Sequence, residues 1–368
     1  MDVLLPISLL AVLLTLFESK GWMRNGMAWG FIIVTIVASL RCDYGNDWPA
    51  YEAMFELFSK YNVTLSNFDS FGLRDEEPGW LLLNMLFRNV SFQWFVVTLT
   101  IFNSVIYYML IRTYVPLNLR PFAVFIYLFN SNFFVLGLSM MRQTLAITMI
   151  AATLPLILRN RILVPLLVIL AASTIHMSAI VALPILLIGM LPEKGSIYRW
   201  IVASFVVLFV VVSISSKEVF AFFLNFITEN EDMSRYAVYD DNSFVTYGLG
   251  YLIGLIPYIL GLIYLWQNSI HHTIDKKVVL LTMIGALVIP LGSAAQMVGR
   301  VAYYFTVFSI VTFPQLFYNK EIVKNNVFRG AFIALFVFIM LYTYYGFFHS
   351  PIWRDAYLEY KTIFSSMS

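Results

Sequence analysis

Long apolar runs separated by short polar connectors dominate this chain. Most runs approach the roughly 20 residues that an α-helix needs to cross the hydrocarbon core of a bilayer. Such a succession predicts membrane-embedded helices from end to end. We place the runs at residues 3–17, 27–41, 79–112, 121–136, 139–158, 162–190, 200–216, 247–266, 278–294, 301–318 and 330–347.

Two of the runs are longer than one crossing requires. The run at 79–112 is expected to break near Asn89–Ser91 into a short helix and a full span. The run at 162–190 exceeds a bilayer width of roughly 20 residues, and we interpret it as a hairpin of two short helices that turns near His176. The expected fold is therefore an all-α, polytopic transmembrane helical bundle of about 10–12 spans with one short helical hairpin.

The composition indicates that lipid solvates most of the surface. Hydrophobic residues make up 60% of the chain and charged residues only 12%, whereas a soluble protein carries about 25% charged residues. No stretch between the runs is long enough for an independent soluble core, so we expect a single integral membrane domain over residues 1–368. The net charge of +2 implies no bulk attraction to nucleic acid.

Charge asymmetry orients the predicted helices. Six short connectors together hold 13 Lys/Arg and 4 acids, whereas the rest of the chain holds 10 Lys/Arg and 17 acids. These connectors are residues 18–26, 112–120, 159–161, 191–199, 267–277 and 319–329. They fall on one face only if the 162–190 run is a hairpin, and the positive-inside rule makes that face cytoplasmic. Both termini are then expected outside, with two acidic, aromatic-rich outer loops at 42–77 and 217–246.

Three arginines and one histidine are predicted at one membrane depth on the outer side. Arg41 ends the second run, Arg142 begins the helix of a later run, and Arg300 ends another. His176 lies at the tip of the hairpin. Charges at membrane depth are costly and usually functional, and guanidinium groups bind phosphate oxygens bidentately. The three arginines therefore favour a polyanionic ligand, such as a lipid-linked diphosphate.

The first outer loop adds the acids Asp43, Asp47, Glu76 and Glu77 at the same depth. Each of these charged groups also has an ordinary interpretation. Arginines at helix ends snorkel to lipid headgroups, a histidine can be a hydrogen-bonded turn residue, and loop acids can simply be solvated. Their coincidence at one level, from distant parts of the chain, favours a functional site over these separate explanations.

Short motifs around these positions resemble the EpsG-like branch of the Wzy-type O-antigen and exopolysaccharide polymerases. The resemblance covers residues 40 to 305, in the order of the family. Two departures are visible: Cys42–Asn46 stands where a glycine-rich stretch is frequent, and Trp80 stands where a tyrosine is common. The matching motifs are Arg41-x5-Asp47-x3-Tyr51, Glu77-Pro78-Gly79-Trp80, Met141-Arg142-Gln143-Thr144-Leu145-Ala146, His176 through Pro184, and Arg300-x2-Tyr303.

The resemblance implies a GT-C-like membrane glycosyltransferase in the bacterial inner (cytoplasmic) membrane. Such an enzyme joins oligosaccharide repeat units carried on undecaprenyl diphosphate at the periplasmic face and releases undecaprenyl diphosphate. Its expected partners are these lipid-linked oligosaccharides, membrane lipids and a regulator of chain length. No cofactor and no metal are expected, which agrees with the lack of a glycine-rich phosphate loop and of zinc-type Cys/His spacing.

We assign roles to the matching residues as hypotheses. The diphosphate is assigned to Arg142 and Arg300, with Arg41 assisting, because charge develops on the leaving group. The acceptor hydroxyl needs a base, for which His176, Asp47 and Glu77 are the candidates; histidine is slightly favoured because an ordinary imidazole titrates near neutral pH. Contacts with substrate are assigned to Tyr51, Gln143, Trp80 and Tyr303.

Two other functions compete with this one. A transporter or flippase for a lipid-linked or anionic solute would carry charges along a route across the membrane, whereas the charges here cluster at one face. An outward-facing acyltransferase would also use a membrane-embedded histidine, so His176 alone does not exclude that class. The repeat-unit sugars and the linkage formed are not encoded in any recognisable pattern.

Overall fold

The structure is a computed structural model, and it describes most of the chain. The predicted outer loop at 217–246 lies outside the described residues. The described residues are 1–61, 63–64, 66–74, 76–192, 195–215, 249–267, 274–292 and 296–364.

The described part of the chain is helical and holds no strand; Arg41 and Thr362 form an isolated β-bridge. Four helices there are long and apolar enough to span a membrane, and a fifth candidate is a pair bent by 66°. Seven shorter apolar helices of 10–17 residues accompany them. The prediction of a polytopic helical membrane protein is confirmed, while the number of spans stays a prediction because it depends on how many short helices cross.

The helices form two compact units. The first unit comprises Met1–Ala152, Leu167–Ile180 and Val337–Ser368, and the second comprises Thr153–Leu166 and Val181–Phe336. Wholly in the first unit are α1 (Leu4–Ser19), α2 (Gly26–Ser39), α3 (Trp48–Lys60), η1 (Phe68–Phe71), α4 (Pro78–Phe87), α5 (Phe92–Tyr114), η2 (Leu117–Leu119), α6 (Arg120–Phe129), α7 (Val135–Ser139), α8 (Met141–Ala152) and α21 (Arg354–Tyr357).

The second unit has its own set of helices, and three further elements have residues in both units. Wholly in the second unit are α9 (Leu154–Leu158), α11 (Pro184–Gly189), α12 (Ile197–Ile214), α14 (Leu249–Gly254), α15 (Ile256–Trp266), α16 (Lys276–Gly292), α17 (Gln296–Val301), α18 (Tyr303–Thr306) and α19 (Ser309–Tyr318). Divided between the units are α10 (Leu163–Ile175), η3 (Met177–Ala182) and α20 (Asn326–His349).

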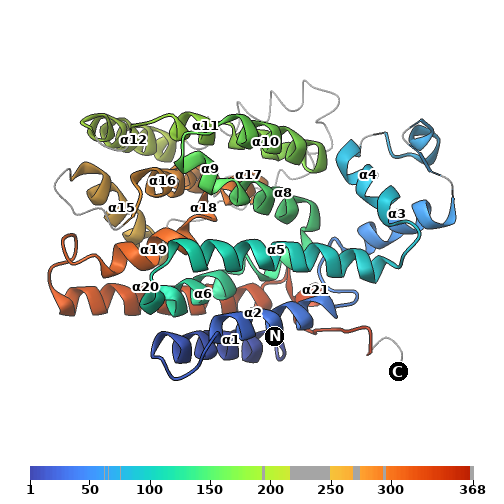
Figure 1. The fold of residues 1–368 in the computed structure, drawn as a ribbon, viewed down its shortest axis with the longest axis horizontal. Helices are drawn as coiled ribbons and strands as arrows, with labels where there is room; N and C mark the ends of the chain where they lie inside the picture. Colours follow the sequence, from blue (N-terminus) through green and yellow to red (C-terminus); the bar gives the residue numbers. More distant parts are fainter. Residues whose placement is uncertain are drawn as a thin grey trace. The chain divides into compact units, whose positions relative to one another are not determined.

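Four helices of the first unit, α1, α2, α5 and α6, pack side by side (Figure 1). Small residues set the close approach of α1 and α2, because a Cβ added to Gly30 would lie 2.9 Å from the Cα of Ala11. Lipid is itself apolar, so apolar side chains gain little free energy by moving from lipid into a helix contact. Close backbone contact is therefore a main source of helix association in a membrane. The arrangement fixes the end of α2, directly before Arg41 and the turn that leads to Asp47.

The predicted break near Asn89–Ser91 is confirmed. The apolar run divides into α4 and α5, and Ser91 caps α5 by accepting a hydrogen bond from the Trp94 N–H at 3.4 Å. A serine at the N-cap satisfies a backbone donor that the first helical turn leaves free. The short helix α4 is therefore separate from the full-length α5. The residues that directly precede α4 lie at one end of the unit.

The predicted hairpin at 162–190 is also present. α10 ends at Ile175, His176 follows, and the chain returns through η3 and α11. A Cβ added to Gly189 would lie 3.5 Å from the Ile162 side chain, so the chain leaves the hairpin beside the point where it entered. With 13 residues, α10 is about 20 Å long, which is shorter than the roughly 30 Å hydrocarbon core.

The C-terminal segment packs on the turn that follows α2. This turn, residues 40–45, exchanges backbone hydrogen bonds with residues 356–363, and the amino group of Met1 donates to the Leu358 carbonyl. Met1 and the described part of the C-terminal segment therefore lie at the end of the unit that carries Arg41. The backbone bonds are Cys42 N–Lys361 O at 3.0 Å, Gly45 N–Ala356 O at 3.1 Å and Ile363 N–Leu40 O at 3.0 Å.

Three of the basic connectors meet at one end of the second unit. Lys277, at the start of α16, donates from Nζ to the Gly189 carbonyl at 2.9 Å and to the Asn160 side chain. Arg199 donates from Nε to the Trp266 carbonyl at 3.3 Å. Described residues of three connectors that were predicted to share one face therefore lie together within this unit.

Candidate functional site

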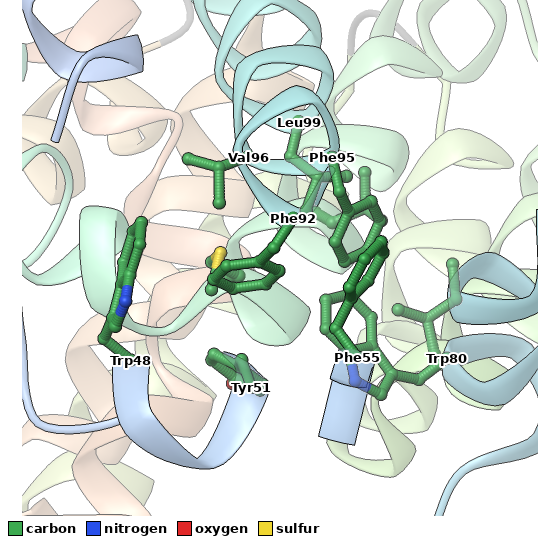
Figure 2. Close-up of a cluster of buried hydrophobic side chains, with 11 residues drawn as sticks. Trp48, Tyr51, Phe55, Trp80, Phe92, Phe95, Val96 and Leu99 are labelled. Atoms are coloured by element: carbon green, nitrogen blue, oxygen red, sulfur yellow. The ribbon is translucent and has the colours of Figure 1, made fainter. Parts of the chain in front are cut away.

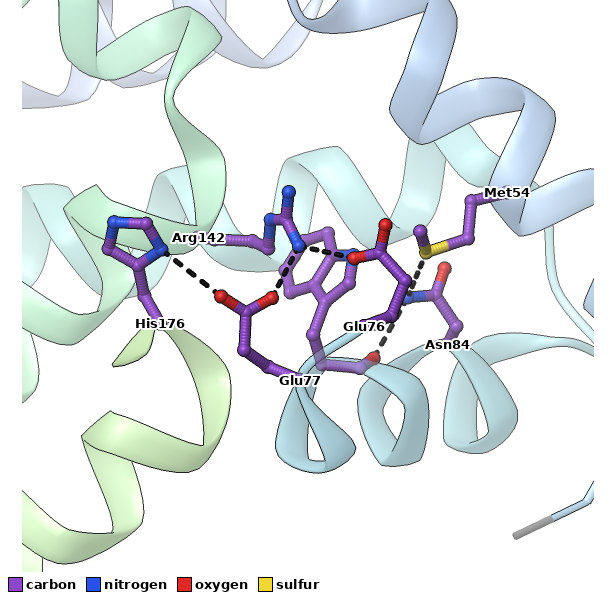
Figure 3. Close-up of polar contacts among 7 residues, drawn as sticks. Met54, Glu76, Glu77, Asn84, Arg142 and His176 are labelled. Atoms are coloured by element: carbon purple, nitrogen blue, oxygen red, sulfur yellow. Dashed lines mark hydrogen bonds and ion pairs between the residues drawn. The ribbon is translucent and has the colours of Figure 1, made fainter. Parts of the chain in front are cut away.

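Arg142 is paired with two adjacent carboxylates. Its Nη1 lies 2.5 Å from Glu76 Oε2 and 2.6 Å from Glu77 Oε2 (Figure 3). The side chains are 24%, 25% and 10% exposed respectively, so Glu77 is the more buried partner. Because charge-assisted hydrogen bonds of this length are about twice as strong as neutral ones, the pair fixes the start of α8 against the residues that precede α4.

The second oxygen of Glu77 faces His176. Glu77 Oε1 lies 3.7 Å from His176 Nδ1, while the other imidazole nitrogen points away from the carboxylate (Figure 3). This separation is too long for a hydrogen bond and makes an ion pair when the imidazole is protonated. Glu77 therefore stands between a guanidinium and an imidazole that are 34 residues apart in the chain.

Local sequence places all three groups at helix ends. Glu77 directly precedes Pro78, the first residue of α4, whose ring is well suited to that position, and His176 follows the last residue of α10. A glycine allows the two segments to meet: a Cβ added to Gly79 would lie 2.3 Å from Thr174 Oγ1 and 2.8 Å from the Thr174 carbonyl oxygen. Any larger residue there would push α4 away from His176.

Electrostatics keep Glu77 ionised. Burial by itself raises the pKa of this carboxyl, but the neighbouring His176 and Arg142 side chains outweigh it and lower the pKa to about 2. A carboxylate with such a low pKa is a poor proton acceptor at neutral pH. With Glu76, Glu77 and Arg142 all ionised, the cluster has a net charge of −1 (two acids against one base), and it becomes neutral if His176 is protonated.

An aromatic cluster lies beneath Arg142. The guanidinium carbon stands 5.5 Å from the ring centre of Tyr51, whose pKa burial raises to about 12. Tyr51 packs against Trp80 at 5.3 Å, and Trp80 packs against Phe95 at 5.2 Å (Figure 2). Tyr51 is 6% exposed and Trp80 is fully buried. Both predicted substrate residues thus form the core under the site, and their contact with a sugar ring stays a prediction.

Asp47 directly precedes α3, one turn before Tyr51. Its backbone N–H donates to Ser139 Oγ at 3.1 Å, so the motif around Asp47 is tied to the segment just before Arg142. Gly45, with a φ of +99°, fits this turn because a Cβ there would lie 2.4 Å from the Cβ of Ser139. Ser139 was not among the predicted site residues; its position three residues before Arg142 was the only signal in the sequence.

Arg41 points into the protein instead of toward the carboxylate cluster. Only 2% of the residue is exposed. Its Nη1 donates to the Ala38 carbonyl at 2.6 Å and to Thr100 Oγ1 at 2.8 Å, and its guanidinium lies 5.8 Å from the Trp48 ring centre. In this position Arg41 offers no surface to a ligand at the membrane boundary, and its assisting role with the diphosphate stays a prediction.

The remaining predicted residues are Gln143, Arg300 and Tyr303. Gln143 follows Arg142 but is buried, with 4% of its surface exposed. Arg300 and Tyr303 belong to the second unit, at the end of α17 and the start of α18, and both are partly exposed. Their roles stay predictions. Within the described ranges, no three His, Cys, Asp or Glu side chains gather as metal ligands.

Taken together, the many apolar helices and the charged cluster at their ends define a polytopic helical membrane protein. The sequence profile of the EpsG family matches residues 28–362, which is nearly the whole chain. The chain belongs to the EpsG family, and this membership indicates a membrane protein of the polysaccharide polymerase type. No curated protein and no solved structure matches it at a significant level.

Proposed function

We propose that this protein is a glycosyltransferase that polymerises lipid-linked oligosaccharide repeat units at the periplasmic face of the bacterial inner membrane. Membership of the EpsG family supports the class. The observation that carries the chemistry is the placement of Glu77 between Arg142 and His176. A buried carboxylate beside an imidazole is the arrangement that orients a histidine as a general base.

In this proposal, His176 accepts the proton of the acceptor hydroxyl and Glu77 positions the imidazole. Nδ1 faces Glu77 (Figure 3), so Nε2 is the nitrogen available to the acceptor. The acceptor oxygen forms a bond with the anomeric carbon of the donor while the bond between that carbon and the diphosphate oxygen breaks. The electron pair leaves with undecaprenyl diphosphate. The low pKa of Glu77 argues against this carboxylate as the base itself.

The diphosphate needs cationic partners, which we assign to Arg300 and Arg142. Arg142 Nη1 is already shared by Glu76 and Glu77, so Arg142 would reach a phosphate through its other N–H groups or by exchanging one carboxylate. Its negative neighbours leave the cluster with too little positive charge to hold a diphosphate alone. Arg300 therefore supplies the further phosphate contact in this proposal, and Arg41 assists from its buried position just before the segment that carries Asp47.

Reconstitution would test the proposed reaction. The purified full chain is placed in vesicles with undecaprenyl-diphosphate-linked repeat units from the source cells, and the products are separated by glycan length. A ladder of lengths and release of undecaprenyl diphosphate are expected. Repeat units that cross the vesicle membrane without any new glycosidic bond would instead indicate a flippase, and transfer of an acyl group to the glycan would indicate an acyltransferase.

A further inference from the structure

Arg41 is a buried cation without a carboxylate partner. Within the described part of the chain no acid lies within 4 Å of its guanidinium, and its Nε has no hydrogen-bond partner. The nearest acid in sequence, Asp43, is instead paired with Lys361 at 3.0 Å. Burial lowers the pKa of Arg41 to about 10, so the side chain is still charged at neutral pH. An uncompensated buried charge is strongly destabilising.

The guanidinium lines a narrow cavity inside the first unit. The cavity has room of about 20 Å³, enough for one water molecule or one ion of similar size. Asn103 and Ser104 of α5 also line it. The Asn103 Oδ1 already accepts a hydrogen bond from Thr148 at 2.6 Å, which leaves the amide nitrogen as the donor. Residues with guanidinium, amide and hydroxyl groups therefore line this space together with apolar side chains, and no carboxylate lines it.

We propose that this cavity binds a small monatomic anion, with chloride as the physiological occupant. The anion would balance Arg41 and accept hydrogen bonds from the amide of Asn103 and the hydroxyl of Ser104. Room for about one water-sized group favours a monatomic anion over phosphate, sulfate or a diphosphate lipid. This site is distinct from the Glu77–His176 cluster and does not depend on the reaction that the protein catalyses.

Thermal unfolding of the purified full chain in detergent tests the proposal. The unfolding midpoint is compared in sodium chloride and in sodium gluconate at equal ionic strength, because equal ionic strength gives equal screening of surface charges. A ligand at ten times its Kd raises the midpoint by about 2 °C in a protein of this size. We expect a rise of this order that saturates with chloride and is reproduced by bromide.

A substitution that supplies the missing negative charge gives the sharpest comparison. Asn103→Asp retains the oxygen that Thr148 needs and places a carboxylate in the cavity, so the variant should be as stable in gluconate as the parent is in chloride. Its response to chloride should disappear. Asn325→Asp, at an exposed position before α20, introduces the same charge elsewhere and should retain the full chloride response.

Two further measurements keep the proposal open to refutation if Asn103→Asp fails to fold. Ser104→Ala removes one donor and should raise the chloride concentration for half-maximal stabilisation several-fold. Crystals soaked in bromide should show an anomalous peak within hydrogen-bond distance of Arg41. Equal midpoints in chloride and gluconate, or a water molecule in place of the bromide peak, would overturn the proposal.

Discussion

Glu77 accepts a hydrogen bond from Arg142 at 2.6 Å and directs its other oxygen at His176, 3.7 Å away. One carboxylate therefore joins three segments that the sequence separates widely: the residues before α4, the start of α8 and the turn after α10. Glu76 contacts the same arginine but not the histidine. This difference between neighbouring acids gives the first test of the site.

Glu77→Gln should lower the polymerisation rate by a factor of at least about 10², because the imidazole loses the group that orients it. Glu76→Gln should have a much smaller effect, since Arg142 retains Glu77 and the His176 contact is untouched. The rate of glycan extension by reconstituted protein checks both variants, with the thermal midpoint as a control for folding. Equal losses in the two variants would contradict a special role for Glu77.

Arg142→Ala should abolish long-chain polymer while the protein still inserts in the membrane, with a loss of roughly 10²–10³ in rate. This substitution also leaves two carboxylates side by side, so Arg142→Lys serves as a second variant that keeps the charge without the planar fork of donors. The lysine variant should recover stability but little activity. Arg112→Ala, at an exposed arginine on α5, is the control, and normal ladders from both Arg142 variants would remove Arg142 from the site.

The low pKa of Glu77 predicts a specific pH dependence of stability. Its pKa falls from 4.5 to about 2 on folding, so the unfolded state binds the proton more readily and the stabilising contribution is full above pH 4.5. The contribution is lost as the pH falls toward 2. The difference in thermal midpoint between the parent and Glu77→Gln should therefore shrink as the pH falls below 4.5. A difference that stays the same between pH 5 and pH 3 would contradict an ionised Glu77.

The sequence predicted the gross layout of the site because run length and bilayer thickness constrain a membrane chain strongly. The break before Ser91 and the hairpin at His176 both follow from runs too long for one crossing. The hairpin in turn brings His176 to the same end of the unit as Arg142. Apolar pattern and charge alone are sufficient for this level of prediction.

Side-chain direction could not be predicted in the same way. Arg41 occupies a helix end that suits either a ligand or the interior, and only its partners Ala38 and Thr100 show that it points inward. The contact between the turn after α2 and the C-terminal segment joins residues more than 300 positions apart, such as Tyr44 and Tyr357. No local pattern records such a pairing, because it depends on how distant helices end in space.

Deletion of residues 354–368 tests that long-range pairing. The segment supplies the backbone partners of Cys42 and Gly45, so its removal should loosen the turn that leads to Asp47. We expect a lower thermal midpoint and strongly reduced polymer. Tyr44→Phe, which removes only the hydrogen bond to the Tyr357 carbonyl, should cost about 1 kcal/mol of unfolding free energy. Full activity of the deletion variant would show that the segment does not position the site.

Gly79→Ala probes the distance between Glu77 and His176 without changing any charged group. The new Cβ would lie 2.3 Å from Thr174 Oγ1 and 2.8 Å from its backbone oxygen. The hydroxyl could rotate away, but the carbonyl belongs to α10, so the start of α4 must move. We expect a loss of activity of at least tenfold at a protein level close to that of the parent.

Gly330→Ala is the matched control, because nothing lies within 4 Å of a Cβ added to that glycine in α20. Alanine in a helix interior is about 1 kcal/mol more favourable than glycine, so this control should retain full activity and unfold at the same or a slightly higher temperature. Thr174→Ala combined with Gly79→Ala should recover little, since the backbone oxygen of residue 174 remains in place. An active Gly79→Ala variant would mean that the proton transfer does not require Glu77 and His176 at their observed separation.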